Sequence, residues 1–277
     1  MTFFMPINYH ILPCLLADLS AHRWVNIAFL FLCFDMSALH EICHHISVVT
    51  GKTFACKSQQ ASGGGCINST YTISDGHATY FIKLNAAHLS EMFAAEADGL
   101  REIRKSNSIR VPEVICSGIT GAQSYLVLEQ LMFGHGDSRS HQQLGLELAQ
   151  MHQCCTGQFG WWRDNSIGST AQQNRQNSHW VEFWRQRRLA VQLRLAAGNG
   201  FAGLLQQRGE QLLADLDCFF ADYSPRASLL HGDLWSGNYA IDTTGRPVIF
   251  DPAVYFGDRE ADLAMTELFG GFNKHFY

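Results

Sequence analysis

The feature that most constrains this chain is the loop HGDLWSGN at residues 231–238, followed by a short apolar run that ends in Asp251. Asp233 and Asn238 lie in this loop with four residues between them. Phosphoryl transfer from a nucleotide needs a carboxylate that accepts the proton of the attacking hydroxyl, and oxygen ligands that hold magnesium. Asp233 suits the first task, and Asn238 with Asp251 suits the second. Gly232 stands where protein kinases have arginine, which favours a kinase for small molecules.

The alternative is that these residues only form turns, because Asp, Asn and Gly are ordinary turn residues. The flanking pattern argues against it. Residues 247–250 are an apolar run typical of a buried strand, so we expect Asp251 at the strand end, facing the loop. Leu229-Leu230 and residues 239–241 also predict short strands on either side of the loop. Turns alone do not explain why Asp233, Asn238 and Asp251 all lie in one strand–loop–strand–turn–strand segment.

A kinase also needs phosphate-binding parts upstream, and candidates occur in the expected order. A run of glycines comes first, where no Cβ blocks backbone N–H groups from phosphate oxygens: Gly63, Gly64 and Gly65. Strands are predicted at residues 70–73 and 78–83, joined by a turn at Asp75-Gly76. Lys83 therefore ends a strand, where a kinase places the lysine that contacts phosphates. Taken singly, a glycine run is more often a flexible loop and such a lysine a solvated one.

Glu96 lies in a segment with helical periodicity, residues 89–103, and is placed to form an ion pair with Lys83. Glu91 is the rival candidate, and a surface charge is the alternative for both. Because the pair would border an open cleft, we expect Lys83→Ala to weaken ATP use without unfolding the protein.

The strand predicted at residues 125–131 runs into two glycines and suits a hinge between lobes. The backbone of Glu129 and Leu131 would then hydrogen-bond the adenine edge of ATP. With 277 residues, the chain is long enough for one two-lobed domain or two small ones.

These residues resemble the fructosamine kinases, or ketosamine-3-kinases, of the aminoglycoside-phosphotransferase-like branch of the kinase fold. The resemblance runs from about Met36 to the end of the chain. The loop with Trp235, joined to the last of the matching segments, is specific to this family rather than to kinases generally. The matching segments are 63–68 (GGGCIN), 81–85 (FIKLN), 95–100 (AEADGL), 164–168 (DNSIG), 231–238 (HGDLWSGN), 251–253 (DPA) and 257–265 (GDREADLAM).

The resemblance implies an α+β, two-lobed protein-kinase-like fold. A small lobe with an antiparallel sheet is expected over residues 36–133, and a mainly helical large lobe over residues 134–277. It further implies ATP-dependent phosphorylation, with Mg2+, of the sugar 3-hydroxyl of ketoamines. The acceptor would be a small-molecule ketoamine or a glycated protein lysine, and the labile 3-phosphate would release the amine.

Site roles follow from the same resemblance. Asp233 is expected to be the catalytic base, Asn238 and Asp251 the metal ligands, and Lys83 with Glu96 the pair that positions the phosphates. Asp262 is expected to brace the catalytic loop.

The polar loop at residues 159–178 resembles the acceptor-side loop of the family. Its candidates for contact with the sugar are Asp164, Asn165, Asn174 and either Trp161 or Trp162. A capped surface loop is the alternative for each of them. Trp235 is a better-placed substrate residue, because it lies two positions from Asp233.

Composition agrees with this interpretation without deciding it. The net charge of −5 argues against nucleic-acid binding, since no basic face is available to neutralise phosphates. The nine cysteines show no C-x-x-C pair and no zinc spacing, which indicates reduced thiols in the cytoplasm. Cys66 in the glycine run is either an oxidisable thiol or a small packed residue. The oligomeric state is left open.

Both ends depart from the family. The apolar run at residues 24–34 is too short for a membrane span, which needs about 20 residues. We expect residues 1–35 to be an extension outside the fold, with no membrane as partner. At the other end, Tyr277 follows soon after the last matching segment. We therefore expect a truncated large lobe that lacks the terminal helices and exposes apolar surface.

Two other functions remain. A phosphotransferase for aminoglycosides or choline-like amino alcohols would share the Asp, Asn, Asp set. It would need several acidic residues on the acceptor side, and the loop at residues 159–178 has only Asp164. The third possibility is an inactive, nucleotide-binding fragment.

Overall fold

The computed structural model describes residues 36–63 and 67–277. The expectations for residues 1–35, Gly64, Gly65 and Cys66 lie outside this described part.

The small lobe is built on a five-stranded antiparallel sheet whose strand order is β1-β2-β3-β5-β4. The expected turn at Asp75-Gly76 is confirmed, because the Asp75 carboxylate accepts hydrogen bonds from the N–H groups of His77 and Ala78. The strands are β1 (Ser58–Ala61), β2 (Ser69–Ser74), β3 (Thr79–Ala86), β4 (Val114–Thr120) and β5 (Gln123–Glu129).

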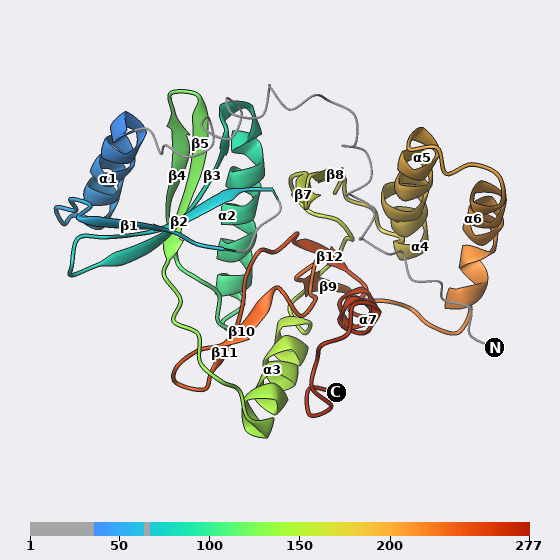
Figure 1. The fold of residues 1–277 in the computed structure, drawn as a ribbon. Coiled ribbons are helices and arrows are strands. Elements are labelled where there is room, and N and C mark those ends of the chain that lie inside the picture. The colour runs from blue at the N-terminus through green and yellow to red at the C-terminus, as the bar shows by residue number, and fades with distance from the viewer. Residues whose placement is uncertain (1–35, 64–66) are drawn as a thin grey trace, which may run out of the picture.

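Two helices cover opposite faces of this sheet, α1 (Met36–Thr50) and α2 (Ser90–Lys105) (Figure 1). Successive side chains of a strand point to opposite faces. In β5, Val127 accordingly packs in the cluster around α1, whereas Leu126 and Leu128 pack in the cluster that contains α2. The sheet therefore holds α2, and with it Glu96, in a fixed place above the strand that carries Lys83.

The large lobe combines helices with short sheets. A three-stranded sheet, β12-β9-β6, and the β10-β11 hairpin lie near α3, whereas the β7-β8 hairpin lies beside α2 (Figure 1). The strands are β6 (Cys155–Thr156), β7 (Asn165–Ile167), β8 (Thr170–Gln172), β9 (Ala227–Leu230), β10 (Tyr239–Ile241), β11 (Pro247–Ile249) and β12 (Tyr255–Gly257). The helices are α3 (Ser138–Met151), α4 (Trp180–Trp184), α5 (Ala190–Gly198), α6 (Leu204–Asp215) and α7 (Glu260–Leu268).

Two features of the large lobe go beyond the sequence pattern. The helical segment from Trp180 to Gly198 is interrupted by a π-helical turn at Arg185–Leu189, where Arg188 is buried. The strands predicted on either side of the catalytic loop are confirmed as β9, β10 and β11, but they belong to two sheets, because β9 pairs with β12 and β6 while β10 pairs with β11. Both features depend on tertiary contacts, which leave no local period in the sequence.

One hydrophobic core runs through both lobes. It joins α2 and β5 of the small lobe to α3, β9 and β11 of the large lobe. Representative fully buried members are Phe93, Leu126, Leu144, Leu229 and Ile249. No helix within the described ranges is long and apolar enough to cross a lipid bilayer.

The packing of α1 generates a stability prediction. Ile42 is fully buried against the sheet, so Ile42→Ala should lower the free energy of unfolding by about 2–5 kcal/mol. Val48 lies on the same helix and is 65% exposed, so Val48→Ala should change it by less than about 0.5 kcal/mol. Urea unfolding of both variants measures this, and equal losses would show that α1 does not stabilise the lobe through this face.

Candidate active site

The catalytic loop, residues 231–238, connects β9 to β10 and crosses closely over the chain that follows β11. Gly232 has a φ of +82°, and a Cβ at this position would lie 2.1 Å from the carbonyl oxygen of Ala253. Only glycine fits such a crossing. The replacement of the kinase arginine at this position therefore has a steric reason that the sequence alone does not reveal.

Asp262 of α7 holds the beginning of the loop, as expected. Its buried carboxylate accepts hydrogen bonds from the backbone N–H groups of His231 and Gly232, at 2.8 and 2.9 Å. The ring Nε2 of His152 lies 3.0 Å from the same carboxylate. Burial alone would raise the pKa of Asp262, but the hydrogen bond and charge of His152, together with the Gly232 N–H, hold this pKa below its ordinary value. The beginning of the catalytic loop is thus held in place by hydrogen bonds to a charged carboxylate.

Asp233 lies partly buried at the centre of the loop. The amide nitrogen of Asn238 donates hydrogen bonds to its backbone oxygen at 2.7 Å and to its carboxylate at 3.2 Å. Burial is the main cause that raises the pKa of Asp233 to about 7, against the hydrogen bond from Asn238 and helped by the nearby charges of Asp251 and Asp262. A carboxylate with such a pKa is a competent proton acceptor near neutral pH.

Lys83 joins the two lobes at the site. Its ammonium group lies 2.7 Å from Oε1 of Glu96 and 2.6 Å from Oδ1 of Asp251. Burial alone would lower the pKa of Lys83, but the two carboxylates outweigh this effect and raise it, so the lysine is held as a cation. The predicted ion pair with Glu96 is confirmed, and the rival Glu91 instead contacts Arg163.

Two cavities meet at this ion-pair cluster. One has a volume of about 300 Å³ and is called the nucleotide-side cavity, because it contains the predicted hinge. The other has a volume of about 280 Å³ and is called the acceptor-side cavity, because it contains the predicted base Asp233. Asn68, Lys83 and Asp251 line both of them. Asp233 and Asn238 line the acceptor side. A hydroxyl bound in one cavity would therefore face a phosphate bound in the other across Lys83 and Asp251.

The nucleotide-side cavity contains the predicted hinge. Gly63, Glu129 and Leu131 line it, with apolar walls from Phe81, Leu128 and Phe250. The carboxylate of Glu129 is engaged by Arg110 at 2.6 Å and its N–H donates to the carbonyl oxygen of Glu113, so this residue has only its backbone carbonyl to offer an adenine ring. Within the described part of the chain, the N–H of Leu131 makes no hydrogen bond to another protein group. It is free to bind a nucleotide edge.

The acceptor-side candidates divide into residues that line the cavity and residues that support its wall. Trp235 and Asn165 line it. The side chain of Asn165 is already engaged with the carbonyl oxygen of Val254 and with the side chains of Gln172 and Asn174.

The remaining candidates for sugar contact are not among the lining residues. Asp164 accepts a hydrogen bond from the N–H of Asn174, which is itself fully buried. Trp161 is also buried. Lining residues that were not predicted from the sequence are Ile67, Asn68, Met92, Ser166, Gly168, Pro252 and Ala253. All of these except Met92 lie in segments that resemble the fructosamine kinases, so the resemblance could have identified them.

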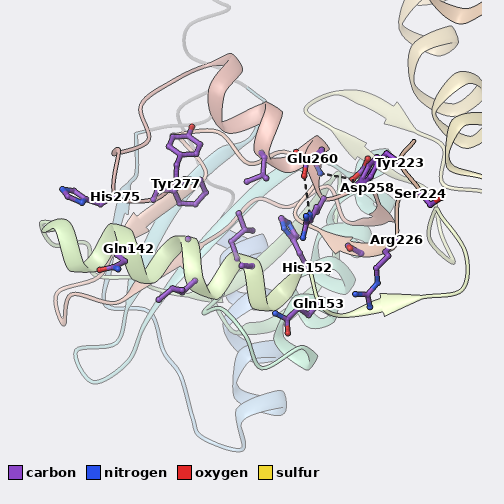
Figure 2. A pocket seen from close by; sticks show the side chains of 18 residues that line it. Gln142, His152, Gln153, Tyr223, Ser224, Arg226, Asp258, Glu260, His275 and Tyr277 are labelled. Atoms are coloured by element: carbon purple, nitrogen blue, oxygen red, sulfur yellow. Dashed lines mark hydrogen bonds and ion pairs between the residues drawn. The ribbon is translucent and has the colours of Figure 1, made fainter. Parts of the chain in front are cut away.

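A larger cavity of about 700 Å³ lies on the other side of the catalytic-loop brace, between α3 and the chain around α7 (Figure 2). His152 lines it, beside the hydrogen-bonded pair Tyr223 and Asp258. Leu146 and Tyr277 at its edge are exposed. This cavity is separate from the meeting point of the two smaller ones, and none of the proposed catalytic groups lines it.

The expectation that the protein stays folded without Lys83 remains a prediction, but a loss of stability must be added to it, because this side chain is only 5% exposed. Lys83→Met would leave Glu96 and Asp251 without their shared cation. We expect a loss of about 3 kcal/mol in the free energy of unfolding, the low end for a broken buried pair because Asp251 is half-exposed. Urea unfolding measures it. The double variant Lys83→Met with Glu96→Gln should recover part of the loss, and an unchanged loss would contradict this electrostatic explanation.

Comparison with known proteins agrees with this geometry. The family model for fructosamine kinase matches residues 38–277. A "Probable ketoamine kinase" of Synechocystis sp. is 47% identical over 241 residues, which cover 85% of this chain and 79% of that protein. A chloroplastic protein-ribulosamine 3-kinase of Arabidopsis thaliana is 38% identical over 218 residues, covering 78% of this chain and 66% of that protein.

Solved structures show the same relationship. A protein of Haemophilus somnus named as a fructosamine-3-kinase superposes with a TM-score of 0.79 at 29% identity, covering 85% of this chain and 79% of that one. An aminoglycoside phosphotransferase in ternary complex with AMP-PNP and hygromycin B superposes with a TM-score of 0.56 at 16% identity, covering 81% and 75%. The second likeness shows a shared protein-kinase-like fold. From the family match and the close relatives, this chain belongs to the fructosamine kinase family and is a phosphotransferase.

Proposed function

We propose that this protein transfers the γ-phosphoryl group of ATP to the sugar 3-hydroxyl of a ketoamine, as a step in deglycation. The observation that carries the proposal is the meeting of two cavities at Lys83 and Asp251, with Asp233 on the acceptor side. The names of the relatives, ketoamine kinase and protein-ribulosamine 3-kinase, support this acceptor class.

In the proposed reaction, Asp233 accepts the proton of the attacking hydroxyl as the new oxygen–phosphorus bond forms. The bond from the γ-phosphorus to the bridging oxygen breaks, and ADP departs. Asn238 holds the Asp233 carboxylate in position through its amide nitrogen. Lys83, fixed by Glu96, offers its cation to the phosphates at the boundary between the cavities. The backbone of Glu129 and Leu131 binds the adenine edge.

The residues present suit magnesium. Asn238 uses its amide nitrogen on Asp233, so its amide oxygen is available, and Asp251 has a second carboxylate oxygen beside the one that binds Lys83. No group of three or more His, Cys, Asp or Glu side chains among the described residues forms a metal site. Magnesium usually takes only one or two protein carboxylates and completes its shell with phosphate oxygens and water. Bound there, it would neutralise phosphate charge.

The acceptor cavity argues against an aminoglycoside as substrate. Its acidic lining residues are Glu96, Asp233 and Asp251, and each is assigned to the transfer machinery. A polycationic acceptor would need further carboxylates beyond these. An inactive nucleotide-binding protein is the other alternative, and it would bind ATP with Mg2+ without turnover. We also propose a cytoplasmic location, because each described cysteine is a free thiol.

The catalytic base gives the most direct prediction. Asp233→Asn should lower the rate of ketoamine phosphorylation by about two to four orders of magnitude, the usual contribution of general-base catalysis. ATP affinity should stay within a few fold, because Asp233 lies on the acceptor side. The exposed Asp215→Asn on α6 is the matched control. Assays with fructosyl-, ribulosyl- and erythrulosyl-lysine, an aminoglycoside and choline check the acceptor, and unchanged turnover in Asp233→Asn would remove the assignment.

The metal ligands give a second prediction. Asp251→Asn and Asn238→Ala should each raise the Mg2+ concentration needed for half-maximal activity by at least about tenfold, since even outer-shell partners of metal ligands contribute 10- to 100-fold in affinity. Titration of Mg2+ at fixed ATP measures this. The Mg2+ dependence of nucleotide binding should be unaltered in Asp233→Asn. A wild-type Mg2+ requirement in both ligand variants would place the metal elsewhere.

A further inference from the structure

Helix α2 forms ion pairs on two sides: Glu96 pairs with Lys83, and a second set of contacts is made by one arginine of the large lobe. The guanidinium of Arg163 contacts the carboxylate of Asp98 and lies 2.8 Å from that of Glu91. Glu91 and Asp98 are seven residues apart, close to two helical turns, so they share one stripe of α2. Glu96 lies away from this stripe and faces Lys83. The helix is therefore tied to β3 by Glu96 and to the large lobe by Arg163.

Arg163 belongs to the segment that forms the acceptor side of the site. The β7-β8 hairpin begins two residues later, and Asn165, Ser166 and Gly168 from it line the acceptor cavity. The hairpin is anchored to the chain after Asp251, because Asn165 and Gln172 donate hydrogen bonds to the carbonyl groups of Val254 and Ala253. The β7-β8 hairpin, which forms a wall of the acceptor cavity, is thus connected both to Arg163 and to the chain after Asp251.

α2 also touches this unit directly. Gly99 faces the chain after Asp251 so closely that a Cβ would lie 3.2 Å from Val254 and 3.5 Å from Pro252. Figure 1 shows α2 standing between the sheet of the small lobe and the β7-β8 hairpin. A displacement of the hairpin would therefore shift α2, and a shift of α2 would change the position of Glu96 relative to Lys83.

We infer that Arg163 is a positioning residue that couples the acceptor site to the nucleotide site by holding α2 to the acceptor-side hairpin. An acceptor that packs against the hairpin stabilises the position of Arg163, which keeps Glu96 directed at Lys83. Acceptor and nucleotide then bind cooperatively, and by linkage each raises the affinity for the other by the same factor. This inference rests on the proposed function for the identity of the acceptor.

The chain supplies a matched control for the test. Arg101 also pairs with Asp98, at 3.1 Å, but it lies on α2 itself and is 50% exposed, so it makes no link to the hairpin. Arg163 is 17% exposed. Removing either arginine takes one positive charge from Asp98, and only removal of Arg163 breaks ion pairs between α2 and the large lobe.

Isothermal titration of ADP with Mg2+, in the presence and absence of saturating fructosyl-lysine, measures the coupling in the full chain. We expect fructosyl-lysine to tighten ADP binding of the wild type and of Arg101→Ala by about fivefold, the lower end for coupled sites. In Arg163→Ala the factor should approach one. Arg163→Lys should be intermediate, because an ammonium lacks the fork that contacts two carboxylates at once. A wild-type factor in Arg163→Ala, or no coupling in the wild type, overturns the inference.

Hydrogen exchange of residues 90–105 tests the connection without any acceptor. The amides of α2 should exchange faster in Arg163→Ala than in the wild type or Arg101→Ala. If wild-type protein neither binds nor phosphorylates fructosyl-lysine, the proposed function fails, and exchange alone then decides whether Arg163 holds α2. Equal exchange in all three proteins would show that Arg163 does not position the helix.

Discussion

The site depends on one cation shared by two carboxylates from different parts of the chain. Lys83 comes from β3, Glu96 from α2 and Asp251 from the end of the segment after β11. Lys83 and Glu96 could not be buried without each other, because an unpaired charge in the protein interior is strongly disfavoured, and the half-exposed Asp251 adds a second carboxylate to the lysine. Their mutual contact fixes the small lobe against the large lobe at the point where the two cavities meet. The same contacts therefore determine both the geometry for phosphoryl transfer and the packing of the two lobes.

The catalytic loop is held by a second buried charge that takes no direct part in the proposed chemistry. Asp262 accepts N–H groups from His231 and Gly232 while His152 supports it from behind. A carboxylate is a stronger acceptor for such groups than a neutral side chain. This arrangement keeps Asp233 fixed while burial raises its pKa towards neutrality. The position of Asp233 thus depends on Asp262 and His152, whereas its raised pKa depends mainly on burial.

The sequence predicted the parts of the site that lie on regular local patterns. The Asp75-Gly76 turn, the strand carrying Lys83 and the helix carrying Glu96 were each predicted from the sequence pattern, and the structure contains all three. The predicted end of the strand at Lys83 was wrong, because β3 continues to Ala86. The supporting contacts were not predictable, because Arg163 meets Asp98 across 65 positions and His152 meets Asp262 across 110. Such pairs leave no local period. The need for glycine at position 232 likewise comes from a backbone 21 residues away in the chain, at Ala253.

The long-range contacts also change how the acceptor loop is understood. Asp164, Asn165 and Asn174 looked like sugar ligands because they are polar and clustered, yet their side chains mainly bind one another and the neighbouring backbone. Arg188, buried at the π-helical turn, donates to Asn174 and completes this network. Polar side chains that bind one another in this way shape a wall and have few groups left to bind a ligand. Under the proposed function, we expect acceptor recognition to depend on other residues that line the cavity, such as Trp235, Asn68 and Ser166.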